Sequence, residues 1–309
     1  RTGDLLLGAH DLGDGLPDDG TANIVRHIYR ADLQRALLDA LMECGGRVET
    51  GHRLTRITHE AAAITAHFAD GSSVTGDLLV GADGVRSVVR AHLAPGDEPR
   101  FTGHVAYRFL VPIERAHPFM NLGRSAIFIG PGRTFNRYTM AQGRIVNGAA
   151  LVETDRQVPE GWSNAAPVAE LRAAFDGWHP DVTGLIGQAT QVIKWGLYDR
   201  APLDRWSEGR LTMLGDAAHA MLPFLGMGAA MAVEDGYVLA QMLARHGDDL
   251  PRALAEYEAR RIARTTQVHL ASKIQGEITQ SIDPDNFVLA GAPVNNREMM
   301  EFDPTAEFA

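Results

Sequence analysis

The chain has 309 residues, 45% hydrophobic and 22% charged, with a formal net charge of −10. This length suits two compact units or one large α/β unit. The acidity argues against a nucleic-acid-binding or anionic-membrane surface, because such surfaces need clustered Lys and Arg, and no apolar run approaches the roughly 20 residues of a membrane span.

The first segment, residues 1–20, contains a turn-rich stretch with four aspartates between positions 11 and 20. The spacing of the aspartates fits no EF-hand loop, so a solvated surface loop is favoured over a calcium site and no metal is expected. The N-terminus shows no basic region followed by an apolar stretch and a cleavage site, so the pattern predicts a soluble, cytoplasmic protein.

Apolar residues at helical spacing predict a helix over 31–44, which Gly45 and Gly46 end. Cys44, the single cysteine, excludes an intramolecular disulfide and lies on the apolar stripe of this helix, which indicates core packing. Strand pieces are expected at 47–50 and 54–58, a hairpin at 63–68 and 73–75, and a short buried strand at 78–80.

Between about 101 and 197 the pattern changes to the alternation of apolar and polar residues that is typical of strands. Strands are predicted at 104–111, 125–129, 136–140 and 145–152, with one helix near 168–175. A strand predicted at 211–214 then resumes the pattern of the first 100 residues, in which short strands adjoin helices. Helices at about 229–245 and 251–278 follow it, and the tail from Asp283 reads as irregular.

These patterns predict an α/β fold in which a mostly antiparallel sheet domain is inserted into a discontinuous, Rossmann-like domain with C-terminal helices. The expected boundaries are 1–100 and 201–280 for the discontinuous domain, 101–200 for the sheet domain and 281–309 for the irregular tail.

The first motif places the strand at 78–80 directly before Gly81, Asp83 and Gly84, with a helix expected from near Val85. A tight glycine turn lets the backbone approach a ligand, and a helix N-terminus offers N–H groups to an anion. The same arrangement is also common in ordinary strand-to-helix connections.

The second motif begins where the strand at 211–214 ends, at Gly215 and Asp216. An acidic residue at the carboxyl end of an α/β strand can accept hydrogen bonds from a ligand hydroxyl. Pro223, Gly226 and Gly228 follow, and the glycines open a helix whose N-terminus can face a flat, negatively charged ring.

Both motifs resemble those of the FAD-dependent aromatic hydroxylases, the salicylate and hydroxybenzoate hydroxylase group, in order and separation. The first motif, with Ser87 and Arg90, is similar to the family's shared FAD and NAD(P)H motif. The second, with His219 and the pair Glu234-Asp235, is similar to its flavin and ribityl motif. A weaker similarity at 29–37 nominates Arg30 as a contact of the flavin or its phosphates. Another at 51–54 nominates the backbone of Leu54 as a contact of the adenine end.

The resemblance implies the following cofactor-binding residues: Arg30, Leu54, Asp83, Gly84, Asp216, Pro223, Gly226, Met227, Gly228 and Ala229. A solvated arginine at a helix start and a plain strand residue stay open as alternatives for Arg30 and Leu54. Met227 stands where glutamine is common in the family, a change that backbone N–H contacts should tolerate.

Candidate catalytic residues are Tyr138, Pro223 and His219, although in the family this histidine looks structural. Related hydroxylases carry a histidine base four residues before the tyrosine, where this chain has Thr134. Threonine cannot take a phenolic proton at neutral pH, so Tyr138, water or an already ionised substrate would serve as base. Arg108 could pair with a substrate carboxylate, and an exposed strand arginine is the alternative.

By resemblance we expect an FAD-dependent monooxygenase in which NADH or NADPH reduces the flavin. O₂ then adds at C4a to give a hydroperoxide, which hydroxylates a small phenolic or hydroxy-acid aromatic. Alternatives within the fold are a halogenase or a reductase, although the lysine- and tryptophan-rich motif of halogenases is not found. No nucleic-acid or membrane partner is expected. The sequence leaves open a monomer or a homodimer, the choice of coenzyme and the exact substrate.

The family's N-terminal GxGxxG turn is not found in these 309 residues. The favoured interpretation is that the sequence is a fragment of a longer polypeptide, since a parallel sheet without its first strand would expose an edge. The alternative is a truncated chain without flavin that acts by binding or is inactive.

Overall fold

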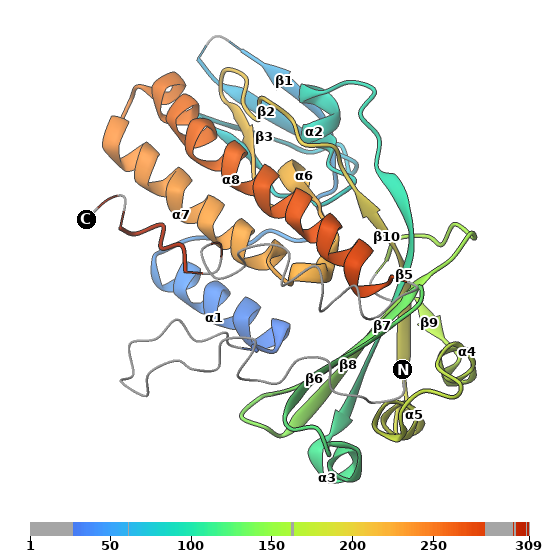
Figure 1. Cartoon of the computed structure of the whole chain (residues 1–309). Helices are drawn as coiled ribbons and strands as arrows, with labels where there is room; N and C mark the ends of the chain where they lie inside the picture. Colours follow the sequence, from blue (N-terminus) through green and yellow to red (C-terminus); the bar gives the residue numbers. More distant parts are fainter. Residues whose placement is uncertain are drawn as a thin grey trace. The chain divides into compact units, whose positions relative to one another are not determined.

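The computed structural model describes residues 27–60, 62–161, 164–281, 299, 301–306 and 308. It divides into two compact units, which are described separately. The sheet unit comprises Arg1–Arg47, Thr102–Leu197 and Glu277–Pro293, and the motif unit comprises Val48–Phe101, Tyr198–Gly276 and Val294–Ala309. The fold is mixed α/β, with an antiparallel sheet and long C-terminal helices (Figure 1).

The sheet unit is built on a six-stranded sheet of order β6-β7-β8-β5-β10-β9. The pairs β5–β8, β6–β7, β7–β8 and β9–β10 are antiparallel. The strands are β5 (Arg100–Pro112), β6 (Ser125–Gly130), β7 (Arg133–Met140), β8 (Ile145–Glu153), β9 (Ala165–Ala166) and β10 (Val192–Asp199). Its helices are α1 (Arg30–Glu43), α3 (Ile113–Ala116), η2 (His117–Phe119), α4 (Val168–Ala174) and α5 (Pro180–Gly187).

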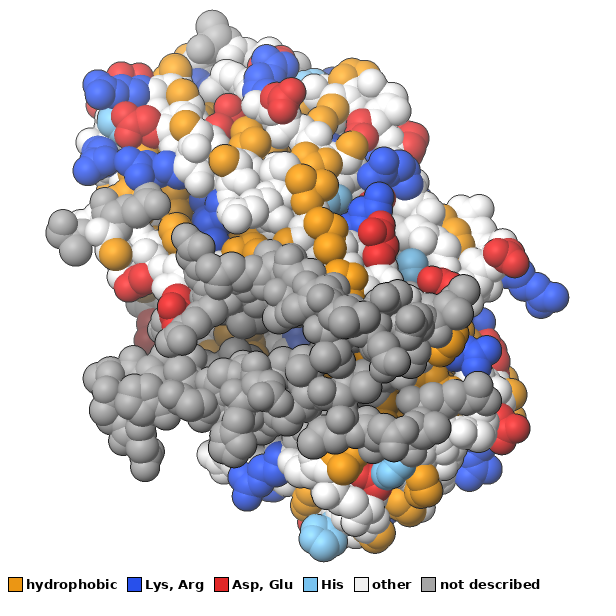
Figure 2. Space-filling view, viewed as in Figure 1, with side chains coloured by type: hydrophobic (Ala, Val, Ile, Leu, Met, Phe, Trp, Pro, Cys, Tyr) orange, Lys and Arg blue, Asp and Glu red, His pale blue; other side chains and the backbone are white. Residues whose placement is uncertain are grey.

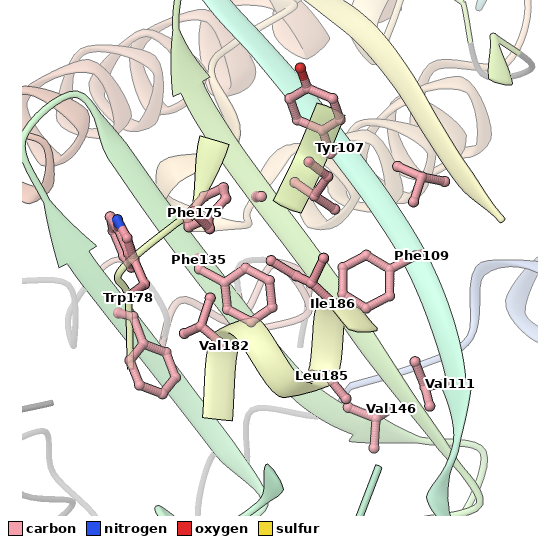
Figure 3. Packing of buried hydrophobic residues seen from close by; sticks show 14 of the residues in the cluster. Tyr107, Phe109, Val111, Phe135, Val146, Phe175, Trp178, Val182, Leu185 and Ile186 are labelled. Carbon is pink, nitrogen blue, oxygen red and sulfur yellow. The ribbon is translucent and has the colours of Figure 1, made fainter. Parts of the chain in front are cut away.

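One face of this sheet carries the core of the sheet unit. Because side chains alternate along a strand, the odd-numbered residues of β5 lie on one face, among them Tyr107 and Phe109. Helix α5 covers that face with Val182, Leu185 and Ile186, as Figure 3 shows. Each such side chain, when fully buried, stabilises the fold by about 1.5–3 kcal/mol. The even-numbered residues are left on the opposite face.

The motif unit contains a three-stranded antiparallel sheet and a two-stranded parallel one. The first is formed by β1 (Leu54–His59), β2 (Ile64–Phe68) and β3 (Ser73–Gly76), and the second by β4 (Leu79–Gly81) and β11 (Leu211–Met213). The helices are α2 (Val88–Leu93), α6 (Asp216–His219), η3 (Pro223–Leu225), α7 (Gly228–His246) and α8 (Leu250–Thr279), of which α8 continues past the unit boundary.

The core of the motif unit joins β11 to the two long helices. Leu211 and Met213 of β11 are fully buried, and the hydroxyl of Tyr257 in α8 donates to the Met213 carbonyl across 3.0 Å. Helices α7 and α8 run side by side in Figure 1, and Val238 and Leu254 belong to the same buried cluster.

On the outer surface of the motif unit, α8 exposes Leu270 and Ile274, and hydrophobic side chains run along this helix in Figure 2. Acidic and basic side chains are interspersed on the face in view. Among the helices that the structure describes, none combines the length and apolarity needed to cross a membrane.

The predicted helices and most of the predicted strands of the described residues are confirmed, with ends shifted by up to four residues. Three predictions are wrong. Residues 47–50 form no strand, and the helix of the first motif begins at Val88 rather than near Val85. Cys44 is exposed, because none of the residues of α1 is buried. The loop at 11–20 and most of the tail lie outside the described residues.

Five elements of the sheet unit were not predicted: the short α3, η2 and β9, and the longer α5 and β10. Helix α5 is short and buries Asp181 beside its apolar residues, so its pattern shows no polar face. Strand β10 carries Lys194 and Gly196 within an otherwise apolar run, which obscures its alternation.

Candidate functional site

The two motifs lie next to each other in the motif unit because their strands are hydrogen-bonded in parallel. Leu79, Val80 and Gly81 of β4 pair with Leu211, Thr212 and Met213 of β11. The Leu214 N–H then donates to the Gly81 carbonyl across 2.9 Å. Since parallel strands end at the same edge of a sheet, the Gly81–Gly84 turn and the Gly215–Asp216 turn emerge together.

The first turn is held by its own side chains. One carboxylate oxygen of Asp83 accepts from the Ser87 hydroxyl at 2.5 Å, and the other accepts from the Val88 N–H at 2.7 Å. Ser87 is the N-cap of α2. A Cβ atom at Gly81 would lie 2.5 Å from the Cβ of Val89, so glycine is needed for α2 to pack here. Asp83 therefore has both oxygens engaged in capping α2.

Arg90 links the first motif to the second. Its fully buried guanidinium donates to the carbonyls of Ala218 at 2.6 Å and Ala217 at 3.3 Å, and also pairs with Asp97 at 2.6 Å. The arginine thus satisfies backbone carbonyls of α6 that would otherwise be buried without donors. Ser87 and Arg90, the two further residues of the first motif, therefore hold the turns of the first and second motifs in place.

In the second motif, Asp216 follows a glycine with a positive φ and faces solvent. Gly215 has φ 61° and ψ −143°, a conformation that favours glycine, and Asp216 begins the short helix α6 with its side chain exposed. The carboxylate therefore lies at the carboxyl end of β11, where a ligand hydroxyl could donate to it.

A buried ion network supports this turn. The Asp235 carboxylate lies 2.6 Å from Nε2 of His219 and accepts from the Gly215 N–H at 2.9 Å and from Nε of Arg261 at 2.7 Å. Burial alone would raise the pKa of Asp235, but the His219 hydrogen bond and the charges of His219 and Arg261 lower it below the ordinary value. Glu234 pairs with Arg261 at 2.7 Å. His219 is therefore a positioning residue of the turn.

His219 also lines a small cavity in the motif unit. The cavity has a volume of about 10 Å³, close to the space that the centre of one water molecule needs, and Trp206 and His269 also line it. Nδ1 of His219, Nε1 of Trp206 and Nδ1 of His269 are buried and have no hydrogen-bond partner among the described residues.

The N-terminus of α7 is open. Met227 precedes the helix without a side-chain cap, and the first turn carries no acidic residue. Gly226 has φ 67°, and a Cβ at Gly226 or Gly228 would meet no atom within 4 Å. Pro223, Gly226 and Ala229 are exposed, whereas Met227 is buried. This helix end therefore offers N–H groups and a partial positive charge to an anionic group.

The open end of α7 is held near the Asp216 turn, since a Cβ at Gly215 would lie 3.3 Å from the Cβ of Ala232. Ala232 is one turn beyond Gly228, so both features belong to one region of the motif unit. Leu54, the first residue of β1, is half-buried and packs against the core of this unit.

The predicted substrate residues lie together in the sheet unit. Arg108 pairs with Ala149, which also pairs with Asn136, and Thr134 and Tyr138 flank Asn136 at a spacing of two. Side chains two apart point to the same face, so Arg108, Thr134 and Tyr138 share the face opposite the core. Arg30 opens α1, which is grouped with this unit, and is exposed.

This face carries polar groups that the sequence did not nominate. Asn147 lies opposite Tyr138 and is 1% exposed, and its Nδ2 has no partner among the described residues. Nε of Arg108 is likewise buried and has no partner among the described residues, while the residue as a whole is half-buried. His27 stacks on the Tyr138 ring with centroids 4.2 Å apart, and burial lowers its pKa. The sequence alone carries no signal for Asn147, because only the pairing of β7 with β8 places it on this face.

Comparison with known proteins gives a consistent result. Residues 16–272 match the family model described as FAD binding domain. The chain is 39% identical over 249 residues to a 3-amino-4-hydroxybenzoate 2-monooxygenase of Streptomyces platensis, covering 81% of this chain and 62% of the relative. It is 32% identical over 298 residues to a 6-hydroxynicotinate 3-monooxygenase of Pseudomonas fluorescens, covering 92% of this chain and 74% of that one.

Among solved structures, a salicylate hydroxylase in complex with its substrate matches with a TM-score of 0.76 and 28% identity. The match covers 91% of this chain and 74% of that structure. The chain spans about three fifths of the length of the first relatives it matches.

Proposed function

Because the chain belongs to the FAD-binding class A flavin monooxygenase family, we propose that it hydroxylates a small phenolic aromatic acid with FAD as cofactor. NADH or NADPH would serve as reductant and O₂ as the oxygen donor. The observation that carries the proposal is the open N-terminus of α7, which directs uncapped N–H groups into space next to the exposed Asp216.

The residues of the motif unit fit an FAD molecule. Asp216 would accept hydrogen bonds from flavin-chain hydroxyls, and the backbone of Gly226, Met227, Gly228 and Ala229 would face the negatively charged side of the ring. Two open glycines leave room for that approach. When bound, FAD supplies electron transfer from the nicotinamide and the activation of O₂. Asp83 would contribute by capping α2, since its two oxygens are engaged there.

The polar face of the sheet unit fits an aromatic acid. An unsatisfied buried donor costs about 1–3 kcal/mol, so Nε of Arg108 and Nδ2 of Asn147 both favour a ligand that brings acceptor oxygens. A carboxylate bound by Arg108 would gain a charge-assisted hydrogen bond. The substrates named for the relatives, hydroxybenzoates and a hydroxynicotinate, combine a ring hydroxyl with a carboxylate.

The ring hydroxyl would interact with Tyr138, which lies on the same face. A phenol becomes more electron-rich when an acceptor holds its proton. The Tyr138 oxygen would therefore accept a hydrogen bond from the ring hydroxyl of the substrate during hydroxylation. Thr134 is 6% exposed and shapes the face without serving as a base.

The experiment is reconstitution of the purified chain with FAD, followed by measurement of bound flavin and of coenzyme oxidation with a panel of hydroxybenzoates. The expected result is bound flavin and aromatic-stimulated oxidation, with one labelled oxygen from ¹⁸O₂ in the product. Failure to bind FAD would reject the cofactor assignment. Oxidation without a hydroxylated product for any phenolic acid would reject the reaction.

Arg108→Ala tests whether Arg108 binds the carboxylate of the substrate. The variant should raise KM for a hydroxybenzoate at least tenfold but leave KM for the matching phenol without a carboxylate nearly unchanged. Arg124→Ala, at an exposed position outside the strands, is the control. Equal losses on the two substrates would mean that Arg108 does not bind the carboxylate.

A further inference from the structure

A group of metal-ligating side chains lies in the motif unit and plays no part in the site described above. His59, His92 and Glu208 each offer one ligand atom, and these atoms all lie within 4.8 Å of one another. We propose that the three residues form a binding site for one divalent transition-metal ion of the Zn²⁺ type.

The two histidines already approach each other as ligands of one ion do. Their Nε2 atoms are 3.1 Å apart, and the rings are stacked with an interplanar angle of 16°. Two nitrogens bound to one Zn²⁺ at about 2.0–2.1 Å in tetrahedral geometry are about 3.3 Å apart. The observed separation of the two nitrogens is therefore close to the one that a common ion requires.

A metal ion would also use both nitrogens better than a hydrogen bond does. Without an ion, one ring must carry a hydrogen on Nε2 and the other must not, because two bare nitrogens repel each other. With both hydrogens on Nδ1, each Nε2 has a free lone pair, and the two neighbouring nitrogens can bind a cation together.

The backbone positions of the three ligands are fixed by separate elements. His59 ends β1, where it pairs with Ile64 of β2, and His92 lies in α2. Glu208 is held by two backbone hydrogen bonds with Leu211, of 2.9 and 3.0 Å. Metal binding would therefore require side-chain rotation only, and the ion would link β1, α2 and the turn before β11.

The surroundings indicate an open site of moderate affinity. All three residues are exposed, so the bound ion would keep water in its remaining position. Arg205 contacts one oxygen of Glu208 at 3.0 Å and competes with a cation for this carboxylate. A site made from residues so far apart in the sequence has no motif spacing, which is why no metal was expected from it.

The test is a Zn²⁺ titration of the tag-free chain by calorimetry, with bound metal counted by elemental analysis after dialysis. We expect one bound Zn²⁺ per chain. His59→Ala, His92→Ala and Glu208→Gln should each raise Kd at least tenfold, while His52→Ala, at an exposed histidine paired with Asp70, should leave Kd unchanged. Arg205→Ala should lower Kd several-fold because it removes the competing cation.

A second measurement uses the wild-type chain and does not depend on the folding of variants. In the NMR spectrum, one equivalent of Zn²⁺ should shift the imidazole signals of His59 and His92 together and leave those of His52 in place. Absence of Zn²⁺ binding by the wild-type chain, or equal binding by the three ligand variants with these two signals unmoved, would overturn the proposal.

Discussion

His219 and Asp235 share a buried hydrogen bond of 2.6 Å, and the same carboxylate oxygen of Asp235 accepts from the Gly215 N–H. A side chain on α7 therefore fixes both ends of the turn that presents Asp216. The histidine is 4% exposed and acts through this turn.

We predict that Asp235→Asn destabilises the chain by about 3–5 kcal/mol, because it removes the carboxylate that pairs with the buried His219 and one of the two carboxylates that pair with the buried Arg261. Urea unfolding followed by circular dichroism measures the change. Asp248→Asn, at an exposed position in the same unit, should shift the unfolding free energy by less than about 0.5 kcal/mol. A small loss in the Asp235 variant would show that the network contributes little.

The same pair predicts a pH dependence. The folded-state pKa of Asp235 is lowered, so its contribution to stability is complete above the unfolded carboxyl pKa of about 3.9 and is lost as the pH falls through the folded value. The difference in unfolding free energy between wild type and Asp235→Asn should therefore be constant near neutral pH and shrink on acidification. A difference that grows in acid would contradict this assignment.

The cavity beside His219 should hold one ordered water. His219, Trp206 and His269 line a space suited to a single water molecule, and each has a buried nitrogen without a partner among the described residues. Such a water molecule needs two to four polar partners. Burial lowers the pKa of His269, so its imidazole is neutral near pH 7. A high-resolution crystal structure should show density within hydrogen-bond distance of these atoms. A dry cavity would contradict the prediction.

Gly226→Ala should weaken FAD binding more than it weakens the fold. Alanine in the left-handed region costs about 1–2 kcal/mol, and the new Cβ would lie in the space that the flavin needs. Gly247→Ala is the control, because Gly247 also has a positive φ and open space but follows the other end of α7. Gly247→Ala should lose at least as much stability by thermal unfolding, since ψ at Gly247 is −115° and lies outside the left-handed region, and only Gly226→Ala should raise the Kd for FAD. Equal flavin binding by the two would remove the N-terminus of α7 from the site.

Tyr138 and His27 can be distinguished as proton acceptors. Tyr138→Phe should lower kcat by about 10²–10⁴-fold if its oxygen handles the phenolic proton. His27→Phe keeps the stacking on Tyr138 but removes the imidazole, which is neutral near pH 7 because burial lowers its pKa. We expect His27→Phe to retain most of kcat and the pH profile of the wild type. A large loss in this variant, rescued by added imidazole, would assign the base role to His27 instead.

Much of the fold followed from local patterns. The helices at α7 and α8 were predicted because their apolar residues recur at helical spacing over many turns, and both motifs were predicted because glycines follow short apolar strands. The errors have local causes as well. Val85 to Ser87 form a turn before α2 because Asp83 caps the helix from four and five residues away. Cys44 lies on an apolar stripe that none of the described residues buries.

By itself, the sequence determined the family and the residues of the two glycine motifs, because turns with positive φ and strand-to-helix connections are set by neighbours along the chain. Only the tertiary structure showed that Asp83 and His219 serve the turns, that Asn147 shares a face with Arg108 and Tyr138, and that His59, His92 and Glu208 converge. These relationships depend on strand register and helix packing, which bring together residues that no local spacing connects.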